Sequence, residues 1–288
     1  MESALRDLFE SSGDADRRRG QGPGPTFSDA HTLVPRQQLT VQFQPQFDIA
    51  TGRGLGVEAL ARWTGSNGRQ VPPSVFIPAS ERTRVVGALG SWVLREACEA
   101  VAAWGDVGTP LPTLSVNLSA LQINEDLCVA VERITDAAGL PAARLELEIT
   151  ESVLIPDRAL AIECLWRLKS YGVHIALDDF GTGYSNYSYL STLPVDRLKL
   201  DKSFADRMIR DRRTAAIVRS LIAMGREIGI EVLAEGVETE RQFGMLEDMG
   251  CTQAQGYLFA RPALPSQART LLMTPWGERR VDRTASAT

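Results

Sequence analysis

Polar and charged residues that could carry out chemistry stand at or close to the downstream ends of short apolar runs. In chain order they are Glu58, Asn117, Glu148, the pair Asp178 and Asp179, Lys199, Glu235 and Gln255. A single carboxylate in such a place is more often a turn residue or a helix cap. Seven such places, separated by intervals comparable to one or two βα units, are difficult to explain in that way. We therefore expect these side chains to act together.

Charge balance predicts that this group of residues binds cations. Five members are carboxylates and one is a lysine, so the formal charge is about −4, which is too costly to leave uncompensated in a confined site. Carboxylates together with the amides of Asn117 and Gln255 form an oxygen ligand set that suits Mg²⁺ or Mn²⁺ rather than zinc. Two such ions per site would bring the charge close to neutral.

Water is the expected nucleophile. His31 lies in a segment that we expect to be a tail, and His174 stands four residues before Asp178. Four residues span about 13 Å of strand, so His174 is expected at the opposite end of its strand from Asp178, in a structural role. The sequence has no Gly-x-Ser-x-Gly elbow and no cysteine at a strand end beside a histidine. A hydroxide held between two metal ions typically attacks a phosphate ester, which is the substrate class that this group predicts.

Short β-rich runs alternate with longer helical runs along the chain. Strands are predicted at 41–47, 56–61, 113–116, 145–149, 173–177, 197–200, 232–234 and 253–255. Helices with apolar residues at every third or fourth position are predicted at 89–104, 125–138, 158–171, 214–228 and 241–249. Thr239 and Gln242 form a capping-box pattern, and Gly139, Gly172, Gly229 and Gly250 stand where helices should end.

Eight strands with helices between them predict an α/β fold of the TIM-like (β/α)8 barrel type. The carboxyl ends of the strands in such a barrel converge on one face, where the active site lies. A doubly wound open sheet is the alternative, but no Gly-x-Gly-x-x-Gly follows the first strand. The barrel is therefore the expected architecture, and it would bring the polar residues together.

Composition and charge exclude several classes of protein. The net charge of −5 argues against a non-specific DNA-binding protein. The chain has 44% hydrophobic residues, which is enough to build a core. Its four cysteines are far apart, so we expect reduced and mostly buried thiols. Neither an apolar run of about 18 residues nor a signal peptide is visible, and the expected location is the cytoplasm without membrane association.

The sequence divides into one domain between two tails. Residues 1–38 combine mixed charge around Arg17 with a Gly/Pro-rich run and are expected to form a flexible N-terminal tail. Residues 39–276 hold all predicted strands and helices. Residues 277–288 are expected to form a flexible C-terminal tail.

A series of motifs across the predicted domain resembles the EAL-domain cyclic di-GMP phosphodiesterases. The motifs are Gln44-Pro45, Glu58-Ala59-Leu60-Ala61-Arg62-Trp63, Ser115-Val116-Asn117-Leu118-Ser119, Glu148-Ile149-Thr150-Glu151, Asp178-Asp179-Phe180-Gly181-Thr182-Gly183, Lys199-Leu200-Asp201, Glu235-Gly236-Val237-Glu238 and Gln255-Gly256-Tyr257. The triplet Glu-Ala-Leu alone is a weak signal, whereas all eight motifs in order are very specific. The resemblance implies an EAL-type barrel that hydrolyses the bacterial second messenger cyclic di-GMP to linear pGpG.

The resemblance also implies roles for individual residues. Metal ligands are implied at Glu58, Asn117, Glu148, Asp178, Asp179 and Glu235, with two Mg²⁺ or Mn²⁺ ions per site. Catalytic roles are implied for Lys199, which would hold the attacking water, and for Glu235, as a general base or a metal ligand. Gln44, Leu60, Arg62 and Gln255 match substrate-binding positions, Arg62 being the contact to a phosphate. Asp201 and Glu238 are alternatively helix-terminal residues without a catalytic role.

Regulation is implied by a segment that follows the aspartate pair. Residues 179–185 match a mobile loop that couples dimerisation to metal binding in the family, and Glu151 matches its anchor. The resemblance thus implies a homodimer. No GGDEF signature accompanies the domain, so a separate regulatory partner that binds the N-terminal tail stays open.

Two alternatives to the enzyme come from different classes. A degenerate member of the family would bind cyclic di-GMP without cleaving it, but such members typically lose a metal ligand, the lysine or the first loop aspartate, and all are present in this sequence. A barrel glycosidase with two carboxylates would not need Asn117, Lys199 or a metal, and EDTA would leave it active.

Overall fold

The computed structural model describes residues 38–65, 67–105, 111–150, 157–181 and 190–278. The two expected tails therefore lie almost wholly outside the described residues. The same holds for His31, for Glu151 and for residues 182–185 of the predicted loop.

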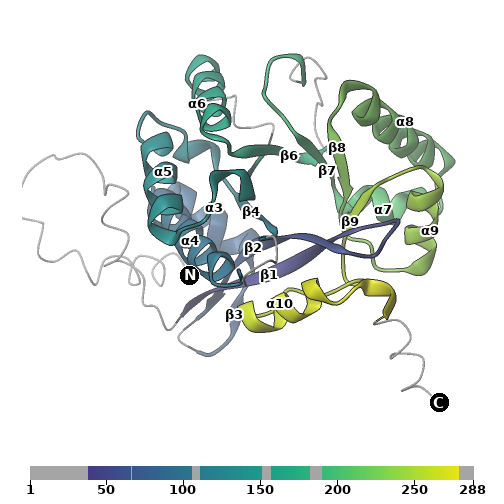
Figure 1. Ribbon diagram of the computed structural model, residues 1–288, viewed down its shortest axis with the longest axis horizontal. Helices are drawn as coiled ribbons and strands as arrows, with labels where there is room; N and C mark the ends of the chain where they lie inside the picture. Colours follow the sequence, from purple (N-terminus) through teal and green to yellow (C-terminus); the bar gives the residue numbers. More distant parts are fainter. Residues whose placement is uncertain (1–37, 66, 106–110, 151–156, 182–189, 279–288) are drawn as a thin grey trace, which may run out of the picture.

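The strands close into a barrel, which confirms the predicted fold (Figure 1). They are β1 (Leu39–Asp48), β2 (Gly54–Thr64), β3 (Gln70–Val71), β4 (Thr113–Asn117), β5 (Leu145–Thr150), β6 (His174–Phe180), β7 (Arg197–Leu200), β8 (Glu231–Ala234) and β9 (Gln253–Gln255). Their order is β1-β9-β8-β7-β6-β5-β4-β2, and the pairing of β1 with β2 closes the ring. The two-residue strand β3 extends the sheet beyond β2 and lies outside the ring.

The first two strands depart from the expected βα repeat. Strand β1 runs antiparallel to both β2 and β9, whereas the pairs from β2–β4 through β8–β9 are parallel. The reason is local: β1 and β2 are joined by a tight turn in which the Gly52 N–H donates to the Asp48 carbonyl and Gly52 adopts a positive φ of 66°. The hairpin places Gln44 directly opposite Glu58, so β1 still contributes to the same face of the barrel.

Helices cover the outside of the barrel, with α4, α5 and α6 on one side and α7, α8 and α9 on the other (Figure 1). The helices are α3 (Pro73–Arg82), α4 (Val86–Ala102), α5 (Leu127–Ala138), α6 (Arg158–Tyr171), α7 (Lys202–Met208), α8 (Arg212–Ile228), α9 (Glu240–Asp248) and α10 (Pro265–Met273), with 3-10 turns at Ala120–Gln122 and Ala142–Arg144. The five predicted helices correspond to α4, α5, α6, α8 and α9. Helices α3 and α10 begin with proline and α7 has seven residues, which makes their periodicity weak.

The predicted helix ends are confirmed at most positions. Thr239 and Gln242 form a reciprocal capping box at the start of α9. Three of the four predicted glycines end a helix in the left-handed conformation: Gly139, Gly172 and Gly229. Gly250 also has a positive φ, but the C-cap residue of α9 is Met249, and Gly250 follows it.

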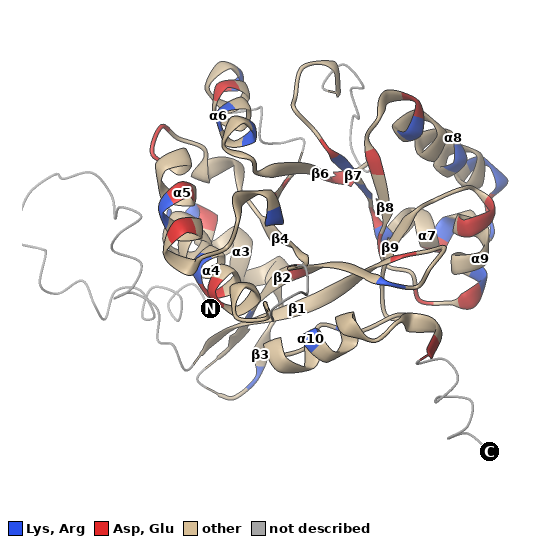
Figure 2. Cartoon of the chain, in the orientation of Figure 1, with Lys and Arg blue, Asp and Glu red and all other residues tan. Residues whose placement is uncertain are grey.

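Alternation along strands such as β5 separates an apolar layer from a polar barrel interior. On β5, Leu145, Leu147 and Ile149 are almost completely buried, and the alternate positions are the equally buried Glu146 and Glu148. The apolar side chains belong to the core between barrel and helices. Charged residues therefore occur on the outer helices and also on strands within the ring of helices (Figure 2).

The four cysteines are unpaired thiols and all are buried, as expected. No helix in the described part of the chain is long and apolar enough to cross a lipid bilayer.

Candidate active site

The centre of the site is the ammonium group of Lys199, which is 1% exposed. Its Nζ lies 2.7 Å from Glu148 Oε2, 2.7 Å from Glu235 Oε1, 3.2 Å from Asp178 Oδ1 and 3.9 Å from Glu58 Oε1. These five residues come from β2, β5, β6, β7 and the residue that follows β8. The structure thus brings together five of the residues that the sequence singled out.

The amide side chains of the predicted site gather on Glu58. Asn117 Nδ2 donates to Glu58 Oε1 at 2.9 Å, and Gln255 Nε2 donates to Glu58 Oε2 at 2.7 Å. Gln255 Nε2 also reaches Gln44 Oε1 at 3.1 Å, and Gln44 Nε2 donates to the Ala260 carbonyl at 3.1 Å. Lys199, Glu58, Glu148, Asp178, Glu235, Asn117, Gln255 and Gln44 are called the carboxylate ring below.

One detail of the sequence prediction was wrong. Glu58 does not end its strand, because β2 continues to Thr64 through its pairing with β1 and with β3. Its side chain nevertheless reaches the ring. The neighbouring strand β4 begins opposite Gly56 and is short, so that Asn117 at its end lies close enough to hydrogen-bond to Glu58.

The aspartate pair coincides with an irregularity in the sheet. The pairing of β6 with β7 shifts between Leu177 and Phe180, so Asp178 and Asp179 have no regular partner on β7, although Asp178 still pairs with Thr150 of β5. Asp179 has a positive φ of 53°, a region that aspartate tolerates better than most residues, and its N–H donates to Asp178 Oδ1 at 2.9 Å. Asp178 contacts Lys199, whereas Asp179 is exposed.

Two cavities flank the ring and share Glu58 and Leu60. The larger, of about 670 Å³, lies between β2, β4, α3 and α4; its apolar wall includes Ile77, Leu89 and Val93, and Arg62 also lines it. The smaller, of about 210 Å³, is lined by ring residues and by Lys202, Glu238 and Tyr257. The ring is therefore reached from an apolar side and from a polar side.

The predicted phosphate contact, Arg62, is half-buried beside the larger cavity. Its Nε donates to Gln42 Oε1 at 3.1 Å, and one terminal nitrogen donates to the Ala61 carbonyl at 3.1 Å. Burial lowers the pKa of the Arg62 guanidinium, although Glu58 opposes this effect. Arg62 stays charged, since a guanidinium does not deprotonate in proteins.

Sequence reasoning gave no role to Tyr257, which lines the smaller cavity, or to Arg261, which packs against it. Tyr257 is 45% exposed, and the Arg261 guanidinium lies 4.2 Å from the centre of its ring. The sequence did contain a signal for Tyr257, because it belongs to the motif Gln255-Gly256-Tyr257. Asp201 caps α7 by accepting from the Ser203 N–H at 3.0 Å, in agreement with its structural interpretation, and Glu238 lies 3.5 Å from Lys202 Nζ.

His174 lies at the opposite end of the barrel from the ring, as the sequence predicted. It is the first residue of β6, and its Nδ1 is 3.5 Å from Asp196 Oδ2. Asp196 also contacts Lys169 and accepts the Ile175 N–H at 2.9 Å. These contacts tie the start of β6 to the segment before β7.

Burial controls the protonation of the ring. It raises the pKa of Glu148 well above its ordinary range and that of Glu235 to about 8, although Lys199 opposes both shifts. Burial alone would lower the pKa of Lys199, but Glu148 and Glu235 outweigh it, and the net shift is well upward. Lys199 is therefore cationic, and Glu235 exchanges a proton near neutral pH.

The donor set of the ring fits a hard divalent cation. Among the described residues, no three acidic, histidine or cysteine side chains already surround a common point for a metal, because the ring carboxylates turn toward Lys199. However, Glu148 Oε1 and Gln255 Oε1 are buried without a hydrogen-bond partner in the described part of the chain. Such oxygens are costly to bury, and oxygen-rich sets bind Mg²⁺ and Mn²⁺. Both atoms are therefore available to a cation.

The metal-free protein is expected to lose stability as pH rises from about 5 to about 8. The folded pKa of Glu235 is about 8 against an ordinary 4.5, so the folded state retains a proton that the unfolded chain releases. The stability that this proton provides is complete below about pH 4.5 and is lost as pH approaches 8. In EDTA, Glu235→Gln should match the wild-type Tm near the acid end and exceed it by several degrees near pH 8. A constant difference between the two Tm curves would contradict this protonation.

The closed sheet and the acidic site around Lys199 define the chain as a β/α barrel with a polar site inside the barrel. The family model described as the EAL domain matches residues 28–262, and the chain belongs to this family. The family resemblance predicted from the motifs is thus confirmed.

Two curated relatives come from Pseudomonas aeruginosa. The protein named bifunctional diguanylate cyclase/cyclic di-GMP phosphodiesterase MucR is 38% identical over 256 residues, 88% of this chain and 37% of MucR. The protein named cyclic di-GMP phosphodiesterase PA2567 is 40% identical over 227 residues, 78% of this chain and 38% of the relative. The chain thus spans about a third of the length of these relatives. A solved structure of the PaMucR phosphodiesterase in complex with c-di-GMP has a TM-score of 0.76 and 39% identity, covering 81% of this chain and 94% of that chain.

Proposed function

We propose that this chain hydrolyses cyclic di-GMP to linear pGpG. The observation that carries the proposal is the complete ring around Lys199: each of its carboxylate contacts comes from a different strand or strand end, as is typical of active sites in β/α barrels. The names of MucR and PA2567 and the c-di-GMP complex of PaMucR support this substrate. The orphaned oxygens of Glu148 and Gln255 support a metal requirement.

Two Mg²⁺ or Mn²⁺ ions, when bound, would neutralise the formal charge of the ring together with Asp179 and lower the pKa of a coordinated water. We assign their ligands to Glu58, Asn117, Glu148, Asp178, Asp179 and Glu235. The arrangement of these residues supports the assignment, because all except the exposed Asp179 lie within the network around Lys199 and Glu58.

The chain's own residues would handle the proton and the charge. Lys199 Nζ lies at the centre of the ring and contacts Glu148 and Glu235; there it would hold the attacking water and stabilise negative charge on the phosphate. Glu235, whose Oε1 lies 2.7 Å from Lys199 Nζ, would accept the proton of that water. The water oxygen would form a bond to phosphorus, the bond between phosphorus and the 3′ oxygen would break, and that oxygen would take up a proton from Glu235 or from solvent.

The two cavities would hold the two halves of the dinucleotide. The larger cavity has an apolar wall that suits a flat purine, and Arg62 is available for a phosphate where the cavity meets the ring. Leu60 is common to both cavities, and Gln44 and Gln255 line the smaller one. These four residues are the proposed substrate-binding set. Tyr257 with Arg261 would add an aromatic surface at the rim.

Assembly and location are also proposals. We propose a homodimer, a cytoplasmic location and control by a separate partner protein, as the resemblance of the motifs to the EAL family implies.

The test is to incubate purified protein with cyclic di-GMP and Mg²⁺ or Mn²⁺ and to separate the products by chromatography. We expect pGpG to form, and EDTA to stop the reaction until metal is restored in excess. Isothermal titration calorimetry with cyclic di-GMP in Ca²⁺ separates binding from turnover. Retained binding without pGpG at high enzyme concentration would make the chain a receptor. Hydrolysis that persists in EDTA would overturn the metal requirement.

A further inference from the structure

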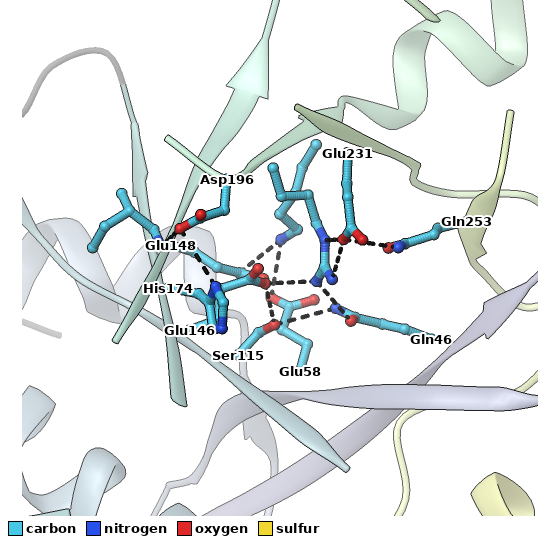
Figure 3. A network of polar contacts seen from close by, with 12 residues as sticks. Gln46, Glu58, Ser115, Glu146, Glu148, His174, Asp196, Glu231 and Gln253 are labelled. Carbon is cyan, nitrogen blue, oxygen red and sulfur yellow. Dashed lines mark hydrogen bonds and ion pairs between the residues drawn. The ribbon is translucent and has the colours of Figure 1, made fainter. Parts of the chain in front are cut away.

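A second polar network lies one layer below the carboxylate ring inside the barrel. Four of its members stand two residues before a ring residue on the same strand: Ser115, Glu146, Arg197 and Gln253 precede Asn117, Glu148, Lys199 and Gln255. Gln46 and Glu231 complete it, Gln46 standing two residues after Gln44 on the reversed strand β1 and Glu231 opening β8. We call these six residues the support layer. Figure 3 labels five of them, Gln46, Ser115, Glu146, Glu231 and Gln253, and shows their side chains turned toward a common centre.

Arg197 is the hub of the support layer. Its NH1 lies 2.8 Å from Glu146 Oε1 and 3.4 Å from Gln46 Oε1, and its NH2 and Nε lie 2.9 and 3.3 Å from Glu231 Oε2. Ser115 Oγ donates to Glu146 Oε1 at 2.7 Å. Each member except Glu231 is buried.

The outer members complete the network. Gln46 Nε2 lies 3.4 Å from Ser115 Oγ, and Gln253 Nε2 donates to Glu231 Oε2 at 2.9 Å. The contacts therefore join β1, β4, β5, β7, β8 and β9 across the interior of the barrel.

The support layer repeats the connections of the ring. In the ring, Lys199 of β7 joins Glu148 of β5 to Glu235, which directly follows β8. In the support layer, Arg197 of β7 joins Glu146 of β5 to Glu231 of β8. Because β6 separates β7 from β5 in the sheet, neither link to β5 is made by backbone hydrogen bonds. The contacts of Arg197 therefore hold together the same strands whose spacing lets Lys199 contact Glu148 and Glu235.

Stability alone does not explain this layer. Barrel interiors are typically filled by Val, Ile and Leu, and replacing a buried ion pair by apolar residues is often neutral or stabilising. An arginine differs from an apolar residue and from lysine because its planar fork is always charged and can hold two carboxylates at once in fixed directions. That property is useful where strand positions must be set accurately.

We propose that Arg197 is a positioning residue for the carboxylate ring, which it serves by holding β5, β7 and β8 where Lys199 meets Glu148 and Glu235. This inference rests on the proposed function, since it assumes that the ring binds metal and turns over cyclic di-GMP. Among the described residues, Arg197 hydrogen-bonds to Glu146, Gln46 and Glu231, none of which is a proposed metal ligand or substrate contact. Its effect would be on kcat and on metal affinity, whereas KM depends mainly on Leu60 and Arg62 in the cavity above.

The experiment compares Arg197→Met and Arg197→Lys with a matched control, Thr135→Val. Thr135 is buried on α5 outside the barrel and hydrogen-bonds to the Val131 carbonyl and to the Tyr171 hydroxyl, so its loss weakens the fold without reaching the site. For each protein we would measure Tm, kcat and KM with cyclic di-GMP, and the Kd of Mn²⁺ by electron paramagnetic resonance.

Arg197→Met is expected to lower kcat and weaken Mn²⁺ binding by about 10- to 100-fold, the usual effect of losing a group that orients metal ligands. KM should change less than about threefold. Arg197→Lys should recover part of both losses, because lysine keeps the charge but not the fork. Thr135→Val should lower Tm and leave kcat and Mn²⁺ affinity at wild-type values. The proposal would be overturned if Arg197→Met had the same kcat and the same Kd for Mn²⁺ as Thr135→Val.

A milder variant covers the case in which Arg197→Met does not fold. Ser115→Ala removes one hydroxyl and its 2.7 Å hydrogen bond to Glu146, and kcat and Mn²⁺ affinity should each fall by about three- to tenfold. Unchanged values for a folded Ser115→Ala would then count against the support layer. If wild-type protein bound Mn²⁺ but formed no pGpG, the proposed function would be overturned. The Kd values of Mn²⁺ for the wild type and the variants would still test whether Arg197 positions the ring. Wild-type protein that does neither would overturn both.

Discussion

Replacing Glu58 by alanine is expected to reduce pGpG formation by roughly a thousandfold or more, because it removes a proposed metal ligand worth several kcal/mol of transition-state stabilisation. Glu58 also accepts hydrogen bonds from Asn117 and Gln255. Its loss would therefore leave two further ring residues without their carboxylate partner. The measurements are the steady-state rate of pGpG release and the Kd of Mn²⁺, and both should change together.

The control for this experiment is His174→Gln. His174 lies at the start of β6 and contacts Asp196, away from the ring, so its replacement should keep the rate within a few-fold of wild type. A histidine variant that proved more damaging than Glu58→Ala would mean that the reaction occurs at the other end of the barrel.

Lys199→Met is expected to abolish turnover and to destabilise the metal-free protein by about 3–5 kcal/mol near pH 8, the usual cost of removing one partner from a buried ion pair. The ammonium group contacts Glu148, Glu235 and Asp178, whose charges would otherwise repel one another. Urea unfolding in EDTA and again in Mn²⁺ measures this effect. Added Mn²⁺ should restore much of the lost stability, because a bound cation can replace the charge of the lysine.

Lys202→Met is the matched control for stability. Lys202 is exposed and its contact with Glu238 is 3.5 Å, so the free energy of unfolding should change by less than about 0.5 kcal/mol. Lys199→Met protein that is as stable as wild type in EDTA would mean that the buried ammonium group does not stabilise the ring.

The ring could be predicted from sequence because two simple signals coincide in it. Charged residues such as Glu148 and Lys199 interrupt or end apolar strands, where they need a partner. Parallel strands of a barrel bring such positions to one face. Long helices with clear periodicity, such as α8, were predictable for the same reason that they are stable, because one face is apolar.

Other features depended on tertiary contacts that the strand pattern does not contain. The sequence between β1 and β2 is a short turn, but the parallel repeat of the rest of the chain hid the hairpin and with it the central position of Glu58 in β2. Helix α3 has a proline inside it and no strong periodicity.

The support layer was missed for a different reason. Glu146 and Arg197 stand in strands that were interpreted as apolar, and each looks like an isolated surface charge until the other is placed 2.8 Å away. A charged residue two positions before a site residue on the same strand is the signal that could have found them, since both side chains then point to the same side of the sheet.

The wall that the two cavities share at Glu58 and Leu60 has a consequence for inhibitor chemistry. A compound that fills the apolar cavity between α3 and α4 would reach the ring from the side and would not need a chelating group. Its affinity would come from buried apolar area, at about 25 cal/mol per Å². Such a compound would bind with or without metal, which distinguishes it from inhibitors that act by sequestering the ions, and chemical differences at Ile77, Leu89 and Val93 would give selectivity among proteins with the same carboxylate ring.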